Sequence, residues 1–335
     1  MPVISEATAP ANIALIKYMG KVDLSNNTPS NSSLSWTLDE LRSFVRITLR
    51  EDLSEDQWQP LKDERLEALQ MSEASVQRYL KHFKMLKDEW GMKKNFLIES
   101  GNNFPSDCGL ASSASSFAAL TKATVRIFQE LAPRPEVGII EMAEWSQKGS
   151  GYSCRSFFGP WTLWYKDGVR PLEFPLSSLL HQVIVVEGEK KEVSSSEAHK
   201  RVLSSDLFKG RPERAEKRLA ELLYALGQED WTAMYEVCWA EFMDMHSLFE
   251  TAKPSFKYIN PASEKVLSFV KNIWQTEGDG PLVTMDAGAN VHFLWRRDQL
   301  QTAKNTAAEL GQQFRIFSSQ ELRESSAINK QENEQ

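Results

Sequence analysis

The feature that most constrains this chain is a loop of small residues between a short apolar run and a long helical pattern. Phe96-Leu97-Ile98 predicts a strand. After the loop, apolar residues recur at helical spacing as far as Leu131, and Pro133 ends the pattern. The loop carries the sequence Pro105-Ser106-Asp107-Cys108-Gly109-Leu110-Ala111-Ser112-Ser113-Ala114-Ser115. A strand that enters a helix through such a loop predicts a mixed fold of helices and strands.

The same loop suits a phosphate group. Glycine lets the backbone approach an anion closely, and the first turn of a helix offers unpaired N–H groups and the positive end of its dipole. Ser112, Ser113 and Ser115 add hydroxyls that can bind phosphate oxygens or a magnesium ion. Small residues also permit tight helix packing, and serines cap helices. The loop is neither a Walker A sequence nor GxGxxG, so taken alone it leaves both interpretations open.

The remaining pattern predicts two lobes, because 335 residues exceed the usual size of one domain. We expect an amino-terminal lobe over residues 1–185, a carboxy-terminal lobe over 186–320 and a polar tail over 321–335. Strands are predicted at 13–16, 41–49, 161–165, 183–187, 281–285 and 291–295, and helices at 72–90, 117–131, 138–148, 211–226, 230–246 and 261–274.

Charge and cysteine usage exclude several classes of protein. The formal net charge of −7 gives no basic footprint for nucleic acid. Cys108, Cys154 and Cys238 are widely spaced and odd in number, which favours free thiols in a reducing compartment. The start lacks a basic segment followed by an apolar run, and no stretch of eighteen apolar residues occurs, so we expect a cytoplasmic protein without a membrane partner.

Four motifs in order resemble those of the mevalonate diphosphate decarboxylases, within the GHMP kinase superfamily. The loop at 105–115 is similar to the Pro-x-x-x-Gly-Leu-Ala-Ser-Ser-Ala motif of that superfamily. Residues 9–21, followed by Asn31-Ser32-Ser33-Leu34-Ser35, resemble the amino-terminal signature of the decarboxylases. Residues 149–156 resemble their arginine loop, and 284–290 resemble their aspartate loop. A weaker likeness is the Lys- and Ser-rich stretch at 190–196.

This resemblance implies an α+β fold of the GHMP type, with an amino-terminal lobe like ribosomal protein S5 domain 2, a ferredoxin-like carboxy-terminal lobe and the active site in the cleft between them. It implies ATP and Mg²⁺, and a reaction that phosphorylates the 3-hydroxyl of mevalonate 5-diphosphate and then releases phosphate and CO₂ to give isopentenyl diphosphate. Relatives are often homodimers.

The resemblance also implies roles for individual residues. Asp286 would orient the hydroxyl and accept its proton, Lys17 would lie beside it, and Arg155 would hold the carboxylate in a bidentate fashion. Without the other motifs, the favoured interpretations are a turn residue for Asp286, a solvated strand end for Lys17 and a structural salt bridge for Arg155. The candidates for the substrate are Tyr18, Lys21, Ser150, Gly151, Ser194 and Ser195, those for ATP are Pro105, Gly109, Leu110, Ala111, Ser112, Ser113 and Ser115, and Ser113 is the candidate for the metal.

The chain departs from the family pattern at four positions. Met19 replaces a tryptophan, Val22 a basic residue, Tyr152 a phosphate-binding serine and Ala289 a proline. Fewer cations near the 5-position favour a relative that acts on mevalonate or its 5-phosphate as a 3-kinase or decarboxylase, and this alternative stays open. A non-catalytic ligand sensor would lack the aspartate or the phosphate loop, and neither is lost here.

Overall fold

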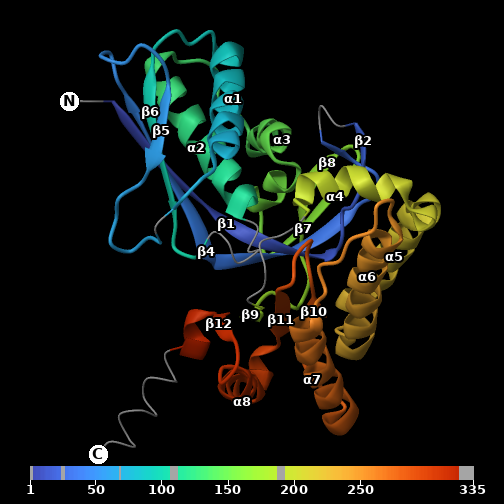
Figure 1. Cartoon of the computed structure of the whole chain (residues 1–335). Helices are drawn as coiled ribbons and strands as arrows, with labels where there is room; N and C mark the ends of the chain where they lie inside the picture. Colours follow the sequence, from blue (N-terminus) through green and yellow to red (C-terminus); the bar gives the residue numbers. More distant parts are fainter. Residues whose placement is uncertain (1–2, 24–26, 68, 106–111, 187–192, 324–335) are drawn as a thin grey trace, which may run out of the picture. The chain divides into compact units, whose positions relative to one another are not determined.

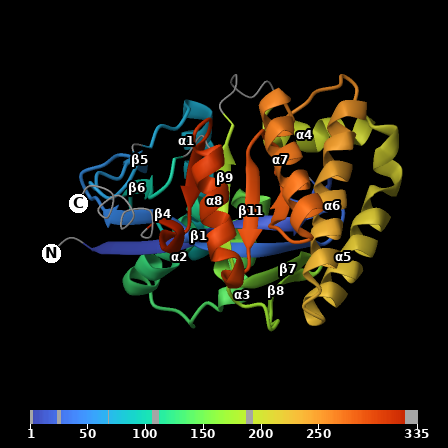
Figure 2. The same cartoon turned by 90° about the horizontal axis from the view of Figure 1, so that it is seen from below.

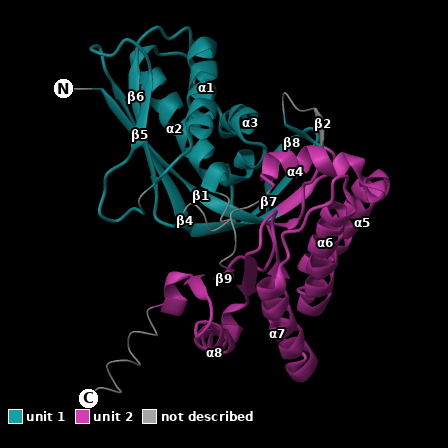
Figure 3. Cartoon of the chain, in the orientation of Figure 1, with its two compact units in different colours: residues 1–13, 22–29, 35–172 teal, residues 14–21, 30–34, 173–335 magenta. Residues whose placement is uncertain are grey.

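The computed structural model describes residues 3–23, 27–67, 69–105, 112–186 and 193–323. The chain forms two compact units that interleave along the sequence (Figure 3). Unit 1 contains residues 1–13, 22–29 and 35–172, and unit 2 contains residues 14–21, 30–34 and 173–335. A short amino-terminal stretch therefore packs with the carboxy-terminal half of the chain. The lobe boundary expected at residue 185 stays a prediction.

Unit 1 is built on a mixed sheet. Its order is β5-β6-β4-β7-β8, and β1 also pairs with β4. Strands β6 and β4 are antiparallel, whereas β5 runs parallel to β6. The strands are β1 (Ile4–Ile16), β4 (Ser33–Leu49), β5 (Gln57–Pro60), β6 (Phe96–Asn102), β7 (Trp161–Tyr165) and β8 (Gly168–Leu172), and a separate two-stranded sheet joins β2 (Lys21–Asp23) to β3 (Thr28–Pro29).

Three helices lie on one face of the unit 1 sheet: α1 (Glu73–Trp90), α2 (Ser112–Leu131) and α3 (Ile139–Gly149) (Figure 1). Ser72 caps α1 by accepting a hydrogen bond from the Ser75 N–H, and Gly91 ends it in a left-handed conformation. The Phe83 and Phe128 rings, from α1 and α2, pack against each other and against Phe96 of β6. This aromatic contact joins α1 to β6 and α2, the two elements between which the phosphate loop lies in the sequence.

Unit 2 contains an antiparallel sheet with the order β10-β11-β9-β12. The chain order across the sheet, second, third, first and fourth strand, is that of the ferredoxin-like fold. The strands are β9 (Leu180–Val185), β10 (Leu282–Thr284), β11 (Val291–Trp295) and β12 (Arg315–Ser318). The helices are α4 (Ser195–Arg201), α5 (Arg211–Gly227), α6 (Trp231–Thr251), α7 (Pro261–Glu277) and α8 (Leu300–Leu310). Short 3₁₀ turns occupy Val202–Ser204, Asp206–Gly210 and Arg297–Gln299.

Helices α7 and α8 lie beside this sheet (Figure 2). Val266 and Val270 of α7 and Ala303 of α8 pack with Ile184 and Phe293 of the sheet in one apolar cluster. Burial of such side chains from water is the main favourable term in holding the layers together. The sheet therefore provides a firm base for the loop that follows β10.

The predicted α+β class and the ferredoxin-like core are confirmed. The helices at 211–226 and 261–274 are confirmed to within a turn, and the strands at 161–165 and 291–295 have their predicted bounds. The strand predicted at 183–187 is displaced, because pairing with β11 and β12 begins at Leu180 and ends at Val185. No helix in the described parts of the chain is long and apolar enough to cross a membrane.

Candidate active site

The centre of the candidate site in unit 2 is an ion pair between residues far apart in the sequence. Lys17 follows the last residue of β1, and Asp286 lies in the loop after β10. Their Nζ and Oδ1 atoms are 2.6 Å apart. Only 2% of the Lys17 side chain is exposed, against 35% for Asp286. A buried ammonium is costly without a partner, so the carboxylate stabilises it, while its own exposure leaves it accessible to a small molecule.

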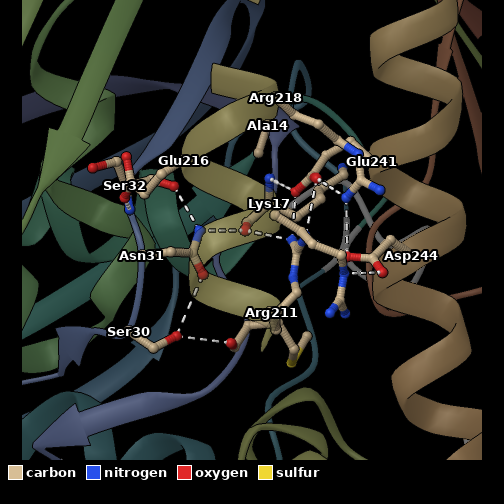
Figure 4. Close-up of polar contacts among 12 residues, drawn as sticks. Ala14, Lys17, Ser30, Asn31, Ser32, Arg211, Glu216, Arg218, Glu241 and Asp244 are labelled. Atoms are coloured by element: carbon tan, nitrogen blue, oxygen red, sulfur yellow. Dashed lines mark hydrogen bonds and ion pairs between the residues drawn. The ribbon is translucent and has the colours of Figure 1, made fainter. Parts of the chain in front are cut away.

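The backbone of Lys17 is held by two fully buried charged side chains (Figure 4). The Lys17 N–H donates to Glu241 Oε1 at 2.8 Å, and the Lys17 carbonyl accepts from Arg211 Nη2 at 3.0 Å. Asn31 Nδ2 donates to the same carbonyl at 3.0 Å. Arg211 and Glu241 come from α5 and α6 and bond directly to each other. Hydrogen bonds therefore hold the Lys17 backbone at both its N–H and its carbonyl.

A wider charge network surrounds this clamp. Arg211 Nη1 lies 2.8 Å from Asp244 Oδ2, and Arg218 Nη1 lies 3.1 Å from Glu241 Oε2 and 3.0 Å from Asp244 Oδ2. Arg214 Nε donates to Asp244 Oδ1 at 2.9 Å. Burial lowers the pKa of Arg211, but the hydrogen bonds and negative charge of Glu241 outweigh it, and the pKa is raised overall. Arg211 therefore stays charged.

This network was not predicted from the sequence, although the spacing of its charged residues indicates that they share helix faces. Arg211, Arg214 and Arg218 recur at intervals of three and four, which places them on one face of a helix, and Glu241 and Asp244 are three apart. The spacing alone does not show that the arginine face of α5 packs against the carboxylate face of α6.

His246 holds the other end of the ion pair. Its Nε2 lies 3.2 Å from the backbone oxygen of Asp286. Burial, followed by the charge of Lys17, lowers the pKa of His246 to about 3. The imidazole is therefore neutral near pH 7, and since a carbonyl only accepts, Nε2 must donate. His246 is not among the site residues predicted from the sequence.

The other unit 2 candidates lie near α4 or just after Lys17. Tyr18 is buried, and its ring centroid is 4.6 Å from that of His199 on α4. Ser194 caps α4 by accepting from the Glu197 N–H at 3.2 Å, and Ser195 is the first residue of that helix. Lys21 begins β2.

The arginine loop lies in unit 1 and forms a short 3₁₀ helix over Gly151–Phe157. Arg155 is 2% exposed, and its guanidinium carbon lies 5.2 Å from the centroid of the Tyr152 ring. The Ser153 hydroxyl donates a hydrogen bond to the backbone carbonyl of the buried Ser150 at 2.7 Å. Tyr152, the residue that departs from the family pattern, thus supports the arginine through its ring.

The phosphate loop is only partly described. Gly109, Leu110 and Ala111 lie outside the described residues, Pro105 precedes the gap and Ser112 begins α2. Ser113 is exposed, whereas Ser115 is buried. The Ser115 hydroxyl lies 2.7 Å from that of Ser43, so it joins α2 to β4. Within the described residues, no group of three or more His, Cys, Asp or Glu side chains could hold a metal ion.

Comparison with known proteins identifies the family. Residues 9–170 match the diphosphomevalonate decarboxylase-like N-terminal domain, and residues 182–335 match the mevalonate 5-diphosphate decarboxylase C-terminal domain. A diphosphomevalonate decarboxylase from Debaryomyces hansenii is 30% identical, over 94% of this chain and 83% of the relative. The chain belongs to the diphosphomevalonate decarboxylase family.

Solved structures of this family share the whole fold. A mevalonate diphosphate decarboxylase from Legionella pneumophila is 46% identical, with a TM-score of 0.89 over 94% of this chain and all of the other. A relative solved in complex with MVAPP, AMPPCP and magnesium is 28% identical, with a TM-score of 0.83 over 95% of this chain and 98% of the other. The predicted family and the GHMP type of α+β fold are confirmed.

Proposed function

We propose that this chain uses ATP to convert mevalonate 5-diphosphate to isopentenyl diphosphate, in the mevalonate pathway of isoprenoid synthesis. The reaction phosphorylates the 3-hydroxyl and then releases phosphate and CO₂. The observation that carries the proposal is the 2.6 Å Lys17–Asp286 ion pair in a chain of this family. The cytoplasmic location and the homodimer expected from the sequence stay predictions.

In this proposal Asp286 is the group that orients the 3-hydroxyl and accepts its proton. Phosphoryl transfer relies on positioning and on charge stabilisation, with a carboxylate beside the attacking hydroxyl. Lys17 holds that carboxylate in place and contributes positive charge where the phosphoryl group moves. The buried clamp on the Lys17 backbone supports this role, because a catalytic group must keep its geometry to within a fraction of an ångström.

Arg155 is assigned to the substrate carboxylate, the group that leaves as CO₂. A guanidinium presents two parallel N–H donors that match a carboxylate, and the contact with the Tyr152 ring orients it. The remaining substrate candidates, proposed for the diphosphate, are Tyr18, Lys21, Ser150, Gly151, Ser194 and Ser195. Their hydroxyl, ammonium and N–H groups suit phosphate oxygens.

ATP is assigned to the loop at 105–115 and the first turn of α2. Mg²⁺ in nucleotide sites is usually held by the substrate phosphates and by one or two protein ligands. Ser113, exposed at the start of α2, remains the candidate ligand. A magnesium ion held there would supply positive charge that offsets the charge of the phosphates.

The test is product analysis with ATP, magnesium and, in separate reactions, mevalonate, its 5-phosphate and its 5-diphosphate. We expect ADP, phosphate and CO₂ in equal amounts from the diphosphate alone. ADP without CO₂, or turnover of a less phosphorylated substrate, would replace the proposal with the 3-kinase or monophosphate alternative.

The catalytic assignment is tested with Asp286→Asn, which keeps the shape of the side chain and removes the base. We expect kcat to fall roughly 10²- to 10⁴-fold with little change in KM. Asp206→Asn is the matched control, because Asp206 is 91% exposed and pairs only loosely with Lys253 at 3.4 Å. Equal activity of both variants would remove Asp286 from the mechanism.

A further inference from the structure

A large cavity lies in unit 1, and its lining, as far as the described residues go, includes none of those assigned to the reaction. Its volume is about 910 Å³, within the range of small-molecule pockets. It is lined by the start of β1, the middle of β4, the segment 61–66, the second half of α2 and the residues that lead into α3. The first turn of α2, where ATP is expected, does not line it.

The charges of the cavity lining are unbalanced toward the positive. Of the described residues in the lining, five are cationic, namely Arg42, Arg46, Arg65, Lys122 and Arg126, and three carry carboxylates, namely Glu6, Asp63 and Glu136. Glu6 pairs with Arg46 and Asp63 pairs with Arg65, both at 2.6 Å, so these four charges balance one another. Arg42, Lys122 and Arg126 remain; Arg42 forms an ion pair with Asp39, and the exposed Glu136 is the carboxylate of the described lining that is in neither of the two pairs.

Lys122 is the centre of those three cations. It is half-buried on α2, and within the described chain it has a ring contact, 4.7 Å from its Nζ to the centroid of Phe157, and no hydrogen bond or ion pair. Burial, followed by the charges of Arg42 and Arg126, lowers its pKa to about 8. Arg42 bonds to the exposed Asp39, and Arg126 donates to the Glu6 carbonyl. In these surroundings an anion that binds beside Lys122 stabilises the charged form of the lysine.

Much of the remaining wall is apolar, although the polar Thr8, Asn103 and Gln129 also line it. The large apolar side chains of the lining include Phe44, Leu61, Leu66, Val125, Val137 and Met142. A purely inorganic anion would contact the cations and leave these side chains unused. An apolar chain attached to the anion would bury them at roughly 0.8 kcal/mol per CH₂ group.

We propose that this cavity binds an anion with an apolar chain, whose head contacts Lys122, Arg42 and Arg126 and whose chain lies against the apolar wall. No described residue of the lining is assigned to catalysis, so we assign the occupant the part of a stabilising ligand and not of a substrate. The proposal does not depend on the proposed function, because binding is measured directly.

The test is calorimetric titration of the full chain with n-octyl phosphate, and with inorganic phosphate for the head alone. We expect one saturable site for octyl phosphate and at least about tenfold weaker binding of inorganic phosphate. Lys122→Met keeps the apolar stem over Phe157 and removes the charge, so the Kd should rise about tenfold or more. Lys84→Met, at an exposed lysine of α1 outside the cavity, is the matched control and should bind as the parent does.

Three results would overturn the proposal. The first is the absence of saturable binding, and the second is equal affinity in Lys122→Met and Lys84→Met. The third is loss of binding when ATP and magnesium are saturating, which would show that the probe occupies the nucleotide site. If Lys122→Met fails to fold by circular dichroism, Arg126→Gln tests the same head contact, since that side chain is exposed.

Discussion

Replacement of Glu241 by glutamine probes the buried clamp on Lys17. Glu241 is fully buried and accepts hydrogen bonds from the Lys17 N–H, from both Nη atoms of Arg211 and from Arg218. Glutamine keeps one acceptor oxygen but turns an NH₂ group toward these donors. Arg211 is then left buried with Asp244 as its remaining carboxylate.

We expect Glu241→Gln to lower the free energy of unfolding by about 3–5 kcal/mol, the cost of removing one partner from a buried ion pair. For a compact unit of this size, that corresponds to a fall in Tm of roughly 6–20 °C. Urea unfolding followed by tryptophan fluorescence and circular dichroism measures the loss.

Glu216→Gln is the matched control. Glu216 is exposed on α5 and accepts from the Ser32 N–H at 2.6 Å, a bond that a glutamine oxygen retains. We expect this change to cost less than about 0.5 kcal/mol. A loss below about 1 kcal/mol in Glu241→Gln, or equal losses in the two variants, would refute the inference that buried charges hold the Lys17 segment.

A double-mutant cycle separates the pair from its surroundings. Arg211→Met alone should also be strongly destabilising, because it leaves Glu241 without its main partner. The double variant should be less destabilised than the sum of the two by at least about 2 kcal/mol. Simple additivity would mean that the two side chains act independently.

Three further predictions follow from local geometry. In Gly149→Ala the new Cβ would lie 2.3 Å from the Phe117 ring, so we expect a loss of about 1–3 kcal/mol in urea unfolding, whereas Gly138→Ala, with open space around it, should cost only a few tenths. Burial lowers the pKa of His82 to about 3, so the unfolded chain binds the extra proton and stability falls as the pH drops below about 6.5. His82→Gln should reduce that slope by about 1.4 kcal/mol per pH unit, measured between pH 6 and 4.5, and an unchanged slope would contradict the assignment. Burial raises the pKa of the Cys154 thiol to about 12, so mass spectrometry should find its alkylation at least about hundredfold slower in the native protein than in urea.

The helices of unit 2 could be predicted from the sequence because large apolar residues repeat along them. Helix α8 was missed because its buried positions are Ala303, Thr306 and Leu310, which give a weak pattern. Strand β1 was predicted at 13–16, although it begins at Ile4, because its buried positions before residue 13 are alanines, a proline and the polar Ser5 and Asn12, which form no apolar run. Strand β12 has four residues beside a polar end, too short for a periodic signal.

The candidate site was less predictable than the fold. Asp286 and Lys17 were assigned through a family resemblance, since no local pattern relates residues so distant in sequence. The ion pair between Arg211 and Glu241 depends on how α5 and α6 are each turned about their own axes. The spacing of apolar residues along a helix defines that orientation only approximately. Charged residues in an amphipathic helix are usually assigned to solvent, and only the structure shows these two fully buried.

The interleaving of the two units has a consequence for the protein during its synthesis. Lys17 leaves the ribosome 269 residues before Asp286 does. At the usual speed of translation this delay is roughly 15–50 s, far longer than a helix or hairpin needs to form. Throughout that time residues 14–21 and 30–34 must wait for partners in α5 and α6 and for the loop after β10. The nascent chain therefore cannot complete this site until nearly all of it has been made, and an interrupted polypeptide carries its lysine without its aspartate.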